Sequence, residues 1–179
     1  ALGDKQGEAL VYCNIGDLYF AQENYKEALA NDLMALKIAE ELADNQLINT
    51  TCILIGKTYF AMKQYKEALN YYLKALKSST ELNDKENMIS SCNGMGNCYE
   101  QQNDYFRALT YYQKALTLSK EIKLKTGIRN AYSNLASANE KLKNYEKALY
   151  YNKLFSEIKD TLLSEESLKQ SAELNTRYE

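Results

Sequence analysis

The sequence repeats itself with a period of 40 residues, and this period constrains the fold more than any other feature. The four copies read NYKEALANDLMALK, QYKEALNYYLKALK, DYFRALTYYQKALT and NYEKALYYNKLFSE, and they begin at Asn24, Gln64, Asp104 and Asn144. Upstream of each copy a small residue keeps the same step: Gly16, Gly56, Gly96 and then Ala136. A fixed period of this length indicates stacked units, none of which buries its apolar face alone.

Each unit is predicted to form two helices. In the second unit, apolar residues three or four positions apart predict a first helix over about residues 45–62 and a second over about 66–82. The chain has no proline and only seven glycines, so little interrupts a helix. We expect Gly56 and Ala68 where the two helices cross most closely, because a larger side chain there would cost about 1–3 kcal/mol. The sixteen tyrosines are expected to fill the core, with hydroxyls reaching the surface.

Composition excludes several classes of function. The net charge is −2, both signs are interspersed, and no basic stripe points to nucleic acid. No apolar run approaches the ~20 residues of a membrane span, so direct membrane contact is not expected. The four cysteines (Cys13, Cys52, Cys92 and Cys98) lack CxxC spacing and histidine is absent, so we expect no metal site and small buried thiols instead.

Catalytic patterns are equally scarce. Without histidine there is no serine triad and no histidine-assisted cysteine chemistry. The glycine-rich stretch Asn93–Asn97 falls inside a predicted helix, so it is not a phosphate loop, and carboxylates occur singly. The sequence therefore predicts no cofactor and no enzyme in this chain.

The third unit shows the pattern most completely, in Met95, Gly96, Tyr99, Tyr105, Ala108, Tyr112 and Ala115. This pattern resembles the tetratricopeptide repeat (TPR) over about residues 10–162. The resemblance implies an all-α fold, a right-handed solenoid of antiparallel helix pairs with a C-terminal capping helix. The period exceeds the usual ~34 residues, so both helices are expected to be longer by nearly a turn. The predicted units are 7–44, 45–84, 85–124 and 125–163.

Both ends of the sequence differ from the repeat. ALGDKQ lines up with ELADNQ one period later, so residues 1–6 are predicted to be the end of a truncated upstream repeat. Residues 164–179 are predicted to form a capping or linker helix, with Ser164 as its N-cap and with Leu168, Ala172 and Leu174 able to lie against the last helix pair. The stretch after residue 158 resembles the junction in bacterial TPR sensor histidine kinases and transcription regulators. That resemblance implies the sensor segment of a larger signalling protein, either cytoplasmic or, if a membrane helix follows, periplasmic.

A peptide-binding groove is the candidate site. In TPR relatives the first helices line the concave face, and counting from the in-phase glycine gives the inward positions. The candidates are Asn14, Asp17, Lys57, Ser90, Asn93, Asn97, Asn130, Asn134 and Ser137. In peptide-binding relatives an asparagine two residues before the glycine holds the ligand backbone, and Asn14 and Asn134 match that position. An amide both donates and accepts hydrogen bonds, although such a residue could equally bond a neighbouring helix.

The groove is expected to hold a peptide or protein segment, read more through its backbone than through its charge. Lys57 alone is basic among the candidates, so the carboxylate clamp of chaperone-adaptor TPRs is not expected. The alternative is an architectural module, in which a homodimer forms through the first edge of the array or through its tail.

Overall fold

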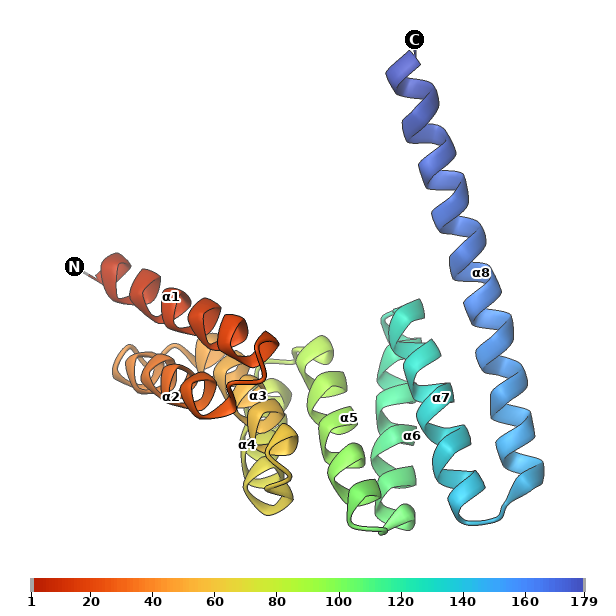
Figure 1. Ribbon diagram of the computed structural model, residues 1–179, viewed down its shortest axis with the longest axis horizontal. Helices are drawn as coiled ribbons and strands as arrows, with labels where there is room; N and C mark the ends of the chain where they lie inside the picture. The colour runs from red at the N-terminus through yellow and green to blue at the C-terminus, as the bar shows by residue number, and fades with distance from the viewer. Residues whose placement is uncertain (1, 179) are drawn as a thin grey trace.

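Residues 2–178 form eight helices in the computed structural model, which describes the side chains of residues 5–170 and 173 (Figure 1). The helices are α1 (Leu2–Ala21), α2 (Tyr25–Glu41), α3 (Asn45–Ala61), α4 (Tyr65–Glu81), α5 (Lys85–Gln101), α6 (Tyr105–Glu121), α7 (Lys125–Lys141) and α8 (Tyr145–Tyr178). No strand occurs in this part of the chain. We call the pairs α1/α2, α3/α4, α5/α6 and α7/α8 units 1 to 4. The all-α solenoid predicted from the repeat is confirmed.

Three-residue turns join the helices at regular intervals. Helices α2 to α7 each contain 17 residues. In the turn after α2, the N–H of Asp44 donates to the carbonyl of Ala39 at 3.0 Å, and the N–H of Ala43 donates to that of Glu40 at 3.1 Å. This is a Schellman motif, and its middle residue, Ala43, has a φ of 51°. The chain thereby reverses after each helix, which makes the two helices of a unit antiparallel.

The first residues differ from the prediction. Residues 2–6 were expected to end an upstream helix, but they form the first turns of α1. Residues 2–6 align with residues 42–46 one period later, where the chain instead turns from α2 into α3.

The expected break at Ser164 is also absent. Helix α8 runs without interruption for 34 residues and rises well beyond the other helices (Figure 1). Ser164 is not an N-cap, because its hydroxyl donates to the carbonyl of Asp160 at 2.9 Å inside the helix. Leu168 is exposed and does not lie against the last pair, and Ala172 and Leu174 fall outside the described side chains.

Leucines on the second helices join one unit to the next. Leu36, Leu76 and Leu116 are buried, and Leu116 packs with Ala131 and Leu135 of unit 4. The close approach expected at Gly56 is confirmed, but its neighbour is the Tyr72 ring, which a methyl group at Gly56 would meet at 2.9 Å. All four cysteines are free and buried, as small core residues would be.

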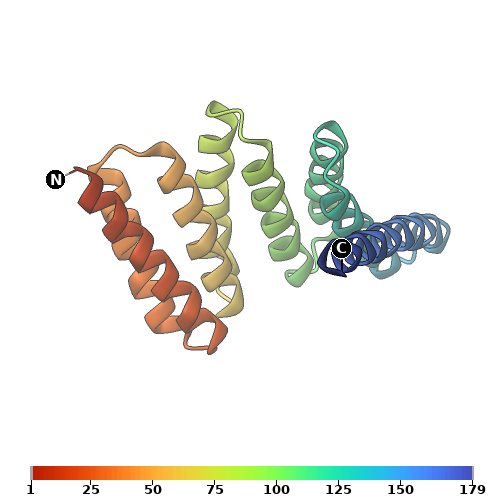
Figure 2. The same ribbon diagram turned by 90° about the horizontal axis from the view of Figure 1, so that it is seen from above.

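The first helix of each unit lines the inner side of the curve. Successive first helices approach each other, α1 with α3, α3 with α5 and α5 with α7, whereas within the described residues no such approach joins successive second helices. The pairs turn progressively along the array, so that α8 is seen almost end-on from above (Figure 2). None of the described helices is apolar enough over a sufficient length to cross a bilayer.

Candidate functional site

Helices α5 and α7 carry six of the nine candidate residues. Ser90, Asn93 and Asn97 follow one another at three- and four-residue spacing on α5, and Asn130, Asn134 and Ser137 do so on α7. Asn93, Asn97, Asn134 and Ser137 are half-buried, while Ser90 and Asn130 are exposed. Residues spaced in this way share one face of a helix. The two rows therefore form a polar surface on the inner side of units 3 and 4.

A hydrogen-bonded network joins these two rows. The hydroxyl of Tyr112 lies 2.8 Å from Oδ1 of Asn97 and 2.6 Å from Oε2 of Glu100. The hydroxyl of Ser137 donates to Oε1 of Glu100 at 2.8 Å. A phenol has one proton, and the carboxylate is the stronger acceptor, so Tyr112 donates to Glu100. Burial, followed by this hydrogen bond, raises the pKa of Tyr112, which keeps it a neutral donor.

Glu100 is a site residue that the sequence reasoning missed. It stands three residues after Asn97 and four after Gly96, one turn further along the same face of α5. Both of its oxygens accept from neutral hydroxyl groups, so the network does not neutralise its charge. Extending the row of inward positions by one turn would have found it.

Two amides on this surface are not committed to hydrogen bonds. Oδ1 of Asn93 is buried and has no partner among the described residues. Within the same residues the side chain of Asn134 makes no hydrogen bond, so it does not bond a neighbouring helix. A buried polar atom such as Oδ1 of Asn93 is costly to leave unpaired, whereas the half-buried amide of Asn134 is open to a bound chain that supplies a donor or an acceptor.

The other three candidates lie in a separate part of the array, on α1 and α3. Asn14, Asp17 and Lys57 are exposed, and Nζ of Lys57 lies 5.0 Å from the centroid of the Phe20 ring. Beneath them Asp32 is 2% exposed and accepts a hydrogen bond from the hydroxyl of Thr58 at 3.3 Å. Because α3 contacts α5, these three residues stand on the same inner side as those of α5 and α7, and the half made by α1 and α3 carries more charge.

The sequence profile of the tetratricopeptide repeat matches residues 7–81, 47–121 and 86–161, in overlapping pairs of units. The chain belongs to the tetratricopeptide repeat family. Its candidate surface is thus the inner face of a TPR array. A comparison with curated protein sequences gives no significant match.

Solved structures share this TPR architecture. Aspartyl phosphate phosphatase F from Bacillus subtilis aligns with 88% of this chain and 42% of its own, at 19% identity and a TM-score of 0.84. A signal transduction ATPase with a TPR sensor from Pyrococcus horikoshii aligns with 86% of this chain and 24% of its own, at 25% identity and a TM-score of 0.78. A Rap protein complexed with competence and sporulation factor aligns with 86% of this chain and 43% of its own, at 21% identity and a TM-score of 0.75. The chain therefore spans less than half the length of each of these three proteins.

Metal binding finds no support in the geometry. Among the described residues, no three carboxylates or thiols gather closely enough to hold an ion. The four thiols also have raised pKa values, since burial disfavours the thiolate form that binds metals; the pKa of Cys98, for example, rises to about 12.

Proposed function

We propose that this TPR array is a non-catalytic module that binds a peptide or protein segment along its concave face, within a larger bacterial signalling protein. The observation that carries the proposal is the pair of uncommitted amides, Asn93 and Asn134, beside the network around Glu100. We also propose the division into units at 7–44, 45–84, 85–124 and 125–163.

The chemistry of the surface favours recognition of a peptide backbone. A side-chain amide offers a donor and an acceptor together, which matches the N–H and C=O groups of an extended chain. In the part formed by α5 and α7, the candidate side chains are amides and hydroxyls without charge. Such groups hold a backbone, and Glu100 adds one carboxylate to the same surface.

The structural neighbours support this assignment by their described roles. One contains a TPR sensor in a signal transduction ATPase, and another is a Rap protein complexed with competence and sporulation factor. Both roles involve recognition of another molecule by a TPR array or by a protein that contains one. We therefore propose a sensory or interaction role for this chain.

Selection from a phage-displayed library of random peptides tests the proposal. The best binder is then titrated against the protein and against the Asn134→Ala variant. Loss of two hydrogen bonds predicts binding weaker by about tenfold or more. Lys159→Ala, an exposed change on α8, serves as the matched control and should leave binding unchanged.

Two outcomes count against the groove. One is equal binding by the Asn134→Ala variant and by the original protein, which removes Asn134 from the site. The other is a library that yields no binder at all. The same titration with Asn14→Ala shows whether the ligand extends to α1.

Self-association is the second candidate, favoured by an apolar face on α1. Val11 and Leu18 are 55% and 58% exposed, whereas their equivalents in units 2 to 4 are buried against the preceding unit. These equivalents are Thr51, Thr58, Ser91, Cys98, Ala131 and Ala138. Exposed apolar faces of this kind favour association between molecules. We propose that two copies would pair through α1. At the opposite end, the outer face of α8 carries Asn152, Ser156 and Lys159 between the exposed Leu149 and Leu163.

Sedimentation velocity over a range of concentrations tests this pairing. The protein should shift toward a dimer as its concentration rises, and the double variant Val11→Glu/Leu18→Glu should stay monomeric. Lys159→Glu, on the outer face of α8, should dimerise like the original chain. A protein that is monomeric at every concentration rejects this candidate.

A further inference from the structure

One repeat position breaks its own pattern in unit 4. Three residues after the in-phase small residue, units 1 to 3 carry Tyr19, Tyr59 and Tyr99, but unit 4 carries Asn139. This position lies on the first helix of each unit and is separate from the concave rows described above. The exchange removes a whole aromatic ring from a place where the rest of the array has one.

Unit 3 shows what the ring does. Tyr99 stacks on Tyr111 of α6, with ring centroids 5.5 Å apart and planes 12° apart. The guanidinium carbon of Arg107 lies 4.7 Å from the centroid of the Tyr99 ring. Both contacts are favourable for an aromatic ring, one by stacking and the other through the positive charge over its π face.

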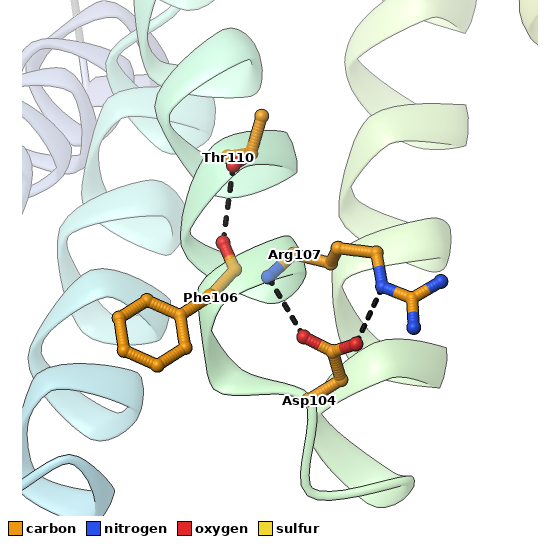
Figure 3. A network of polar contacts seen from close by, with 4 residues as sticks. All are labelled: Asp104, Phe106, Arg107 and Thr110. Carbon is orange, nitrogen blue, oxygen red and sulfur yellow. Dashed lines mark hydrogen bonds and ion pairs between the residues drawn. The ribbon is translucent and has the colours of Figure 1, made fainter.

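Asp104 fixes the orientation of the Arg107 side chain for this contact. Asp104 accepts from the backbone N–H of Arg107 at 3.1 Å and from its Nε at 2.5 Å. Figure 3 shows the carboxylate between these two donors, with the guanidinium directed toward the neighbouring helix. The ring of Tyr99 therefore packs in a site formed by Tyr111, Arg107 and Asp104 of α6.

Unit 4 lacks the ring and keeps part of its surroundings, with Asn144 in the place of Asp104. Tyr151 occupies the place of Tyr111, and Lys147 that of Arg107. Asn139 folds back along α7, where its Nδ2 donates to the carbonyl of Leu135 at 2.7 Å. A pocket of about 440 Å³ remains. Its lining includes Leu135 and Asn139 of α7, Leu109 of α6, and Lys147, Tyr150 and Tyr151 of α8.

We propose that this pocket binds a single aromatic ring, such as a phenol, in the place that Tyr99 fills in unit 3. The pocket lies between α6 and α8, on the side of the array opposite to the first helices that line the groove. Its volume falls in the usual range for ligand sites, and its lining is divided evenly between leucines and tyrosines on the one hand and polar or charged side chains on the other.

The remaining contacts suit a ring rather than an aliphatic chain. Tyr151 already contacts the rings of Tyr132 and Tyr150, with ring centroids 6.2 Å and 5.3 Å away, so a bound ring would extend an aromatic cluster beside the cation of Lys147. The hydroxyl of Tyr151 donates to Oε1 of Gln113 at 3.4 Å, so a weak bond from α8 to α6 closes one side of the pocket. Asn139 and Gln113 can bond a phenol hydroxyl.

Titration of ¹⁵N-labelled protein with p-cresol, followed by NMR, tests the site. The side-chain amide of Asn139 and the backbone amides of Tyr150 and Tyr151 should shift and saturate, with a Kd on the order of 1 mM for so small a ligand. 4-Methylcyclohexanol has nearly the same size without aromaticity, and it should bind at least fivefold more weakly. Equal binding of the two compounds overturns the aromatic specificity.

Two reciprocal variants provide the controls. Asn139→Tyr restores the ring of units 1 to 3, and p-cresol should then bind at least tenfold more weakly while the variant keeps or gains thermal stability. Tyr99→Asn empties the equivalent site in unit 3, and p-cresol should then shift the amides around Arg107 and Tyr111. The proposal fails if Asn139→Tyr binds p-cresol as the original protein does, or if the original protein shows no saturable shift.

A second ligand distinguishes a tyrosine side chain of a partner protein from a free aromatic molecule. N-acetyl-tyrosinamide carries the same phenol on a peptide backbone. Binding at least as tight as that of p-cresol identifies a tyrosine side chain of a partner protein, whereas much weaker binding identifies a free aromatic molecule. The site is independent of the concave groove, so Asn134→Ala should leave p-cresol binding unchanged.

Discussion

Asp32, Tyr72 and Tyr112 occupy the same position in units 1 to 3, and they show how one residue changes a unit boundary. The Tyr72 ring lies so close to Gly94 of the next unit that a methyl group there would meet it at 2.4 Å. Where Asp32 replaces the ring, the residue equivalent to Gly94 is Leu54. A smaller side chain on one unit is thus matched by a larger one on the next.

This exchange makes folding stability depend on the ionisation of Asp32. The pKa of Asp32 is raised to about 6 in the folded protein: burial raises it most and nearby Asp17 also raises it, whereas the hydrogen bond from Thr58 and the charge of Lys57 lower it. In the unfolded chain its pKa is the ordinary 3.8. The folded state therefore binds more protons between these values, and this contribution to stability is lost as pH rises through 6.

Denaturation with urea at pH 5 and pH 7.5 measures this contribution. Asp32→Asn keeps the shape and the hydrogen bond to Thr58 while removing the charge. The variant should exceed the original protein in unfolding free energy by about 1–2 kcal/mol more at pH 7.5 than at pH 5. Cys13 of α1 also faces Asp32, but its raised pKa of about 11 keeps it neutral at both values. A difference that does not vary with pH would contradict the assignment.

At the residue scale, the sequence predicted part of the candidate site. Counting from the glycine predicted that Asn97 and Ser137 would face inward, and both join the network with Glu100. The counting did not predict Glu100, because it stopped one turn short of the position from which both carboxylate oxygens accept hydrogen bonds. The substitution at Asn139 was visible in the alignment of the repeats, but its consequence depends on how Tyr150 and Leu109 close around the space.

Each turn between helices places a residue in the left-handed region. Its φ lies between 51° and 62° at Glu23, Ala43, Lys63, Asn83, Asn103, Lys123 and Lys143. None of these is glycine, although glycine adopts this conformation at least cost. The turns therefore store strain at every junction, least where asparagine stands, since asparagine tolerates the left-handed region.

Glycine at such a position should stabilise the protein. Ala43→Gly relieves roughly 1–2 kcal/mol of strain and gives back part of this through the greater freedom of the unfolded chain. We expect a net gain of about 1 kcal/mol in unfolding free energy, measured with urea. Asn83→Gly is the matched control and should gain clearly less. A loss of stability in Ala43→Gly would show that the turn gains nothing from relief of its backbone.

At the element scale, the sequence predicted the helices of unit 2 to within a residue or two. The predictions of 45–62 and 66–82 compare with Asn45–Ala61 and Tyr65–Glu81, because period, spacing and turn residues agree there. The prediction failed at Ser164, where serine and acidic residues resemble a helix start. No tight turn precedes Ser164, and a serine inside a helix can bond the carbonyl four residues back, as this one does.

At the scale of the whole molecule, the helix contacts of the described residues all join helices of the same unit or of neighbouring units. Leu76 packs against Cys92 and Met95 of unit 3, and Leu116 packs against Ala131 and Leu135 of unit 4. In the same position of α8, Ser156 is exposed. Stability of such an array is approximately a sum over units and over the boundaries between them.

Two equivalent substitutions should therefore have different global effects. Leu116→Ala and Leu76→Ala each remove about 2–5 kcal/mol from one boundary. Weakening the boundary at Leu116 leaves three packed units, so hydrogen exchange should lose protection in α7 and α8 alone. Weakening the boundary at Leu76 leaves two halves of two units each, fewer than the three that such arrays need. Protection should then fall in all helices together. If both variants lost protection uniformly, the four units would behave as one globular core, and the nearest-neighbour description would be wrong.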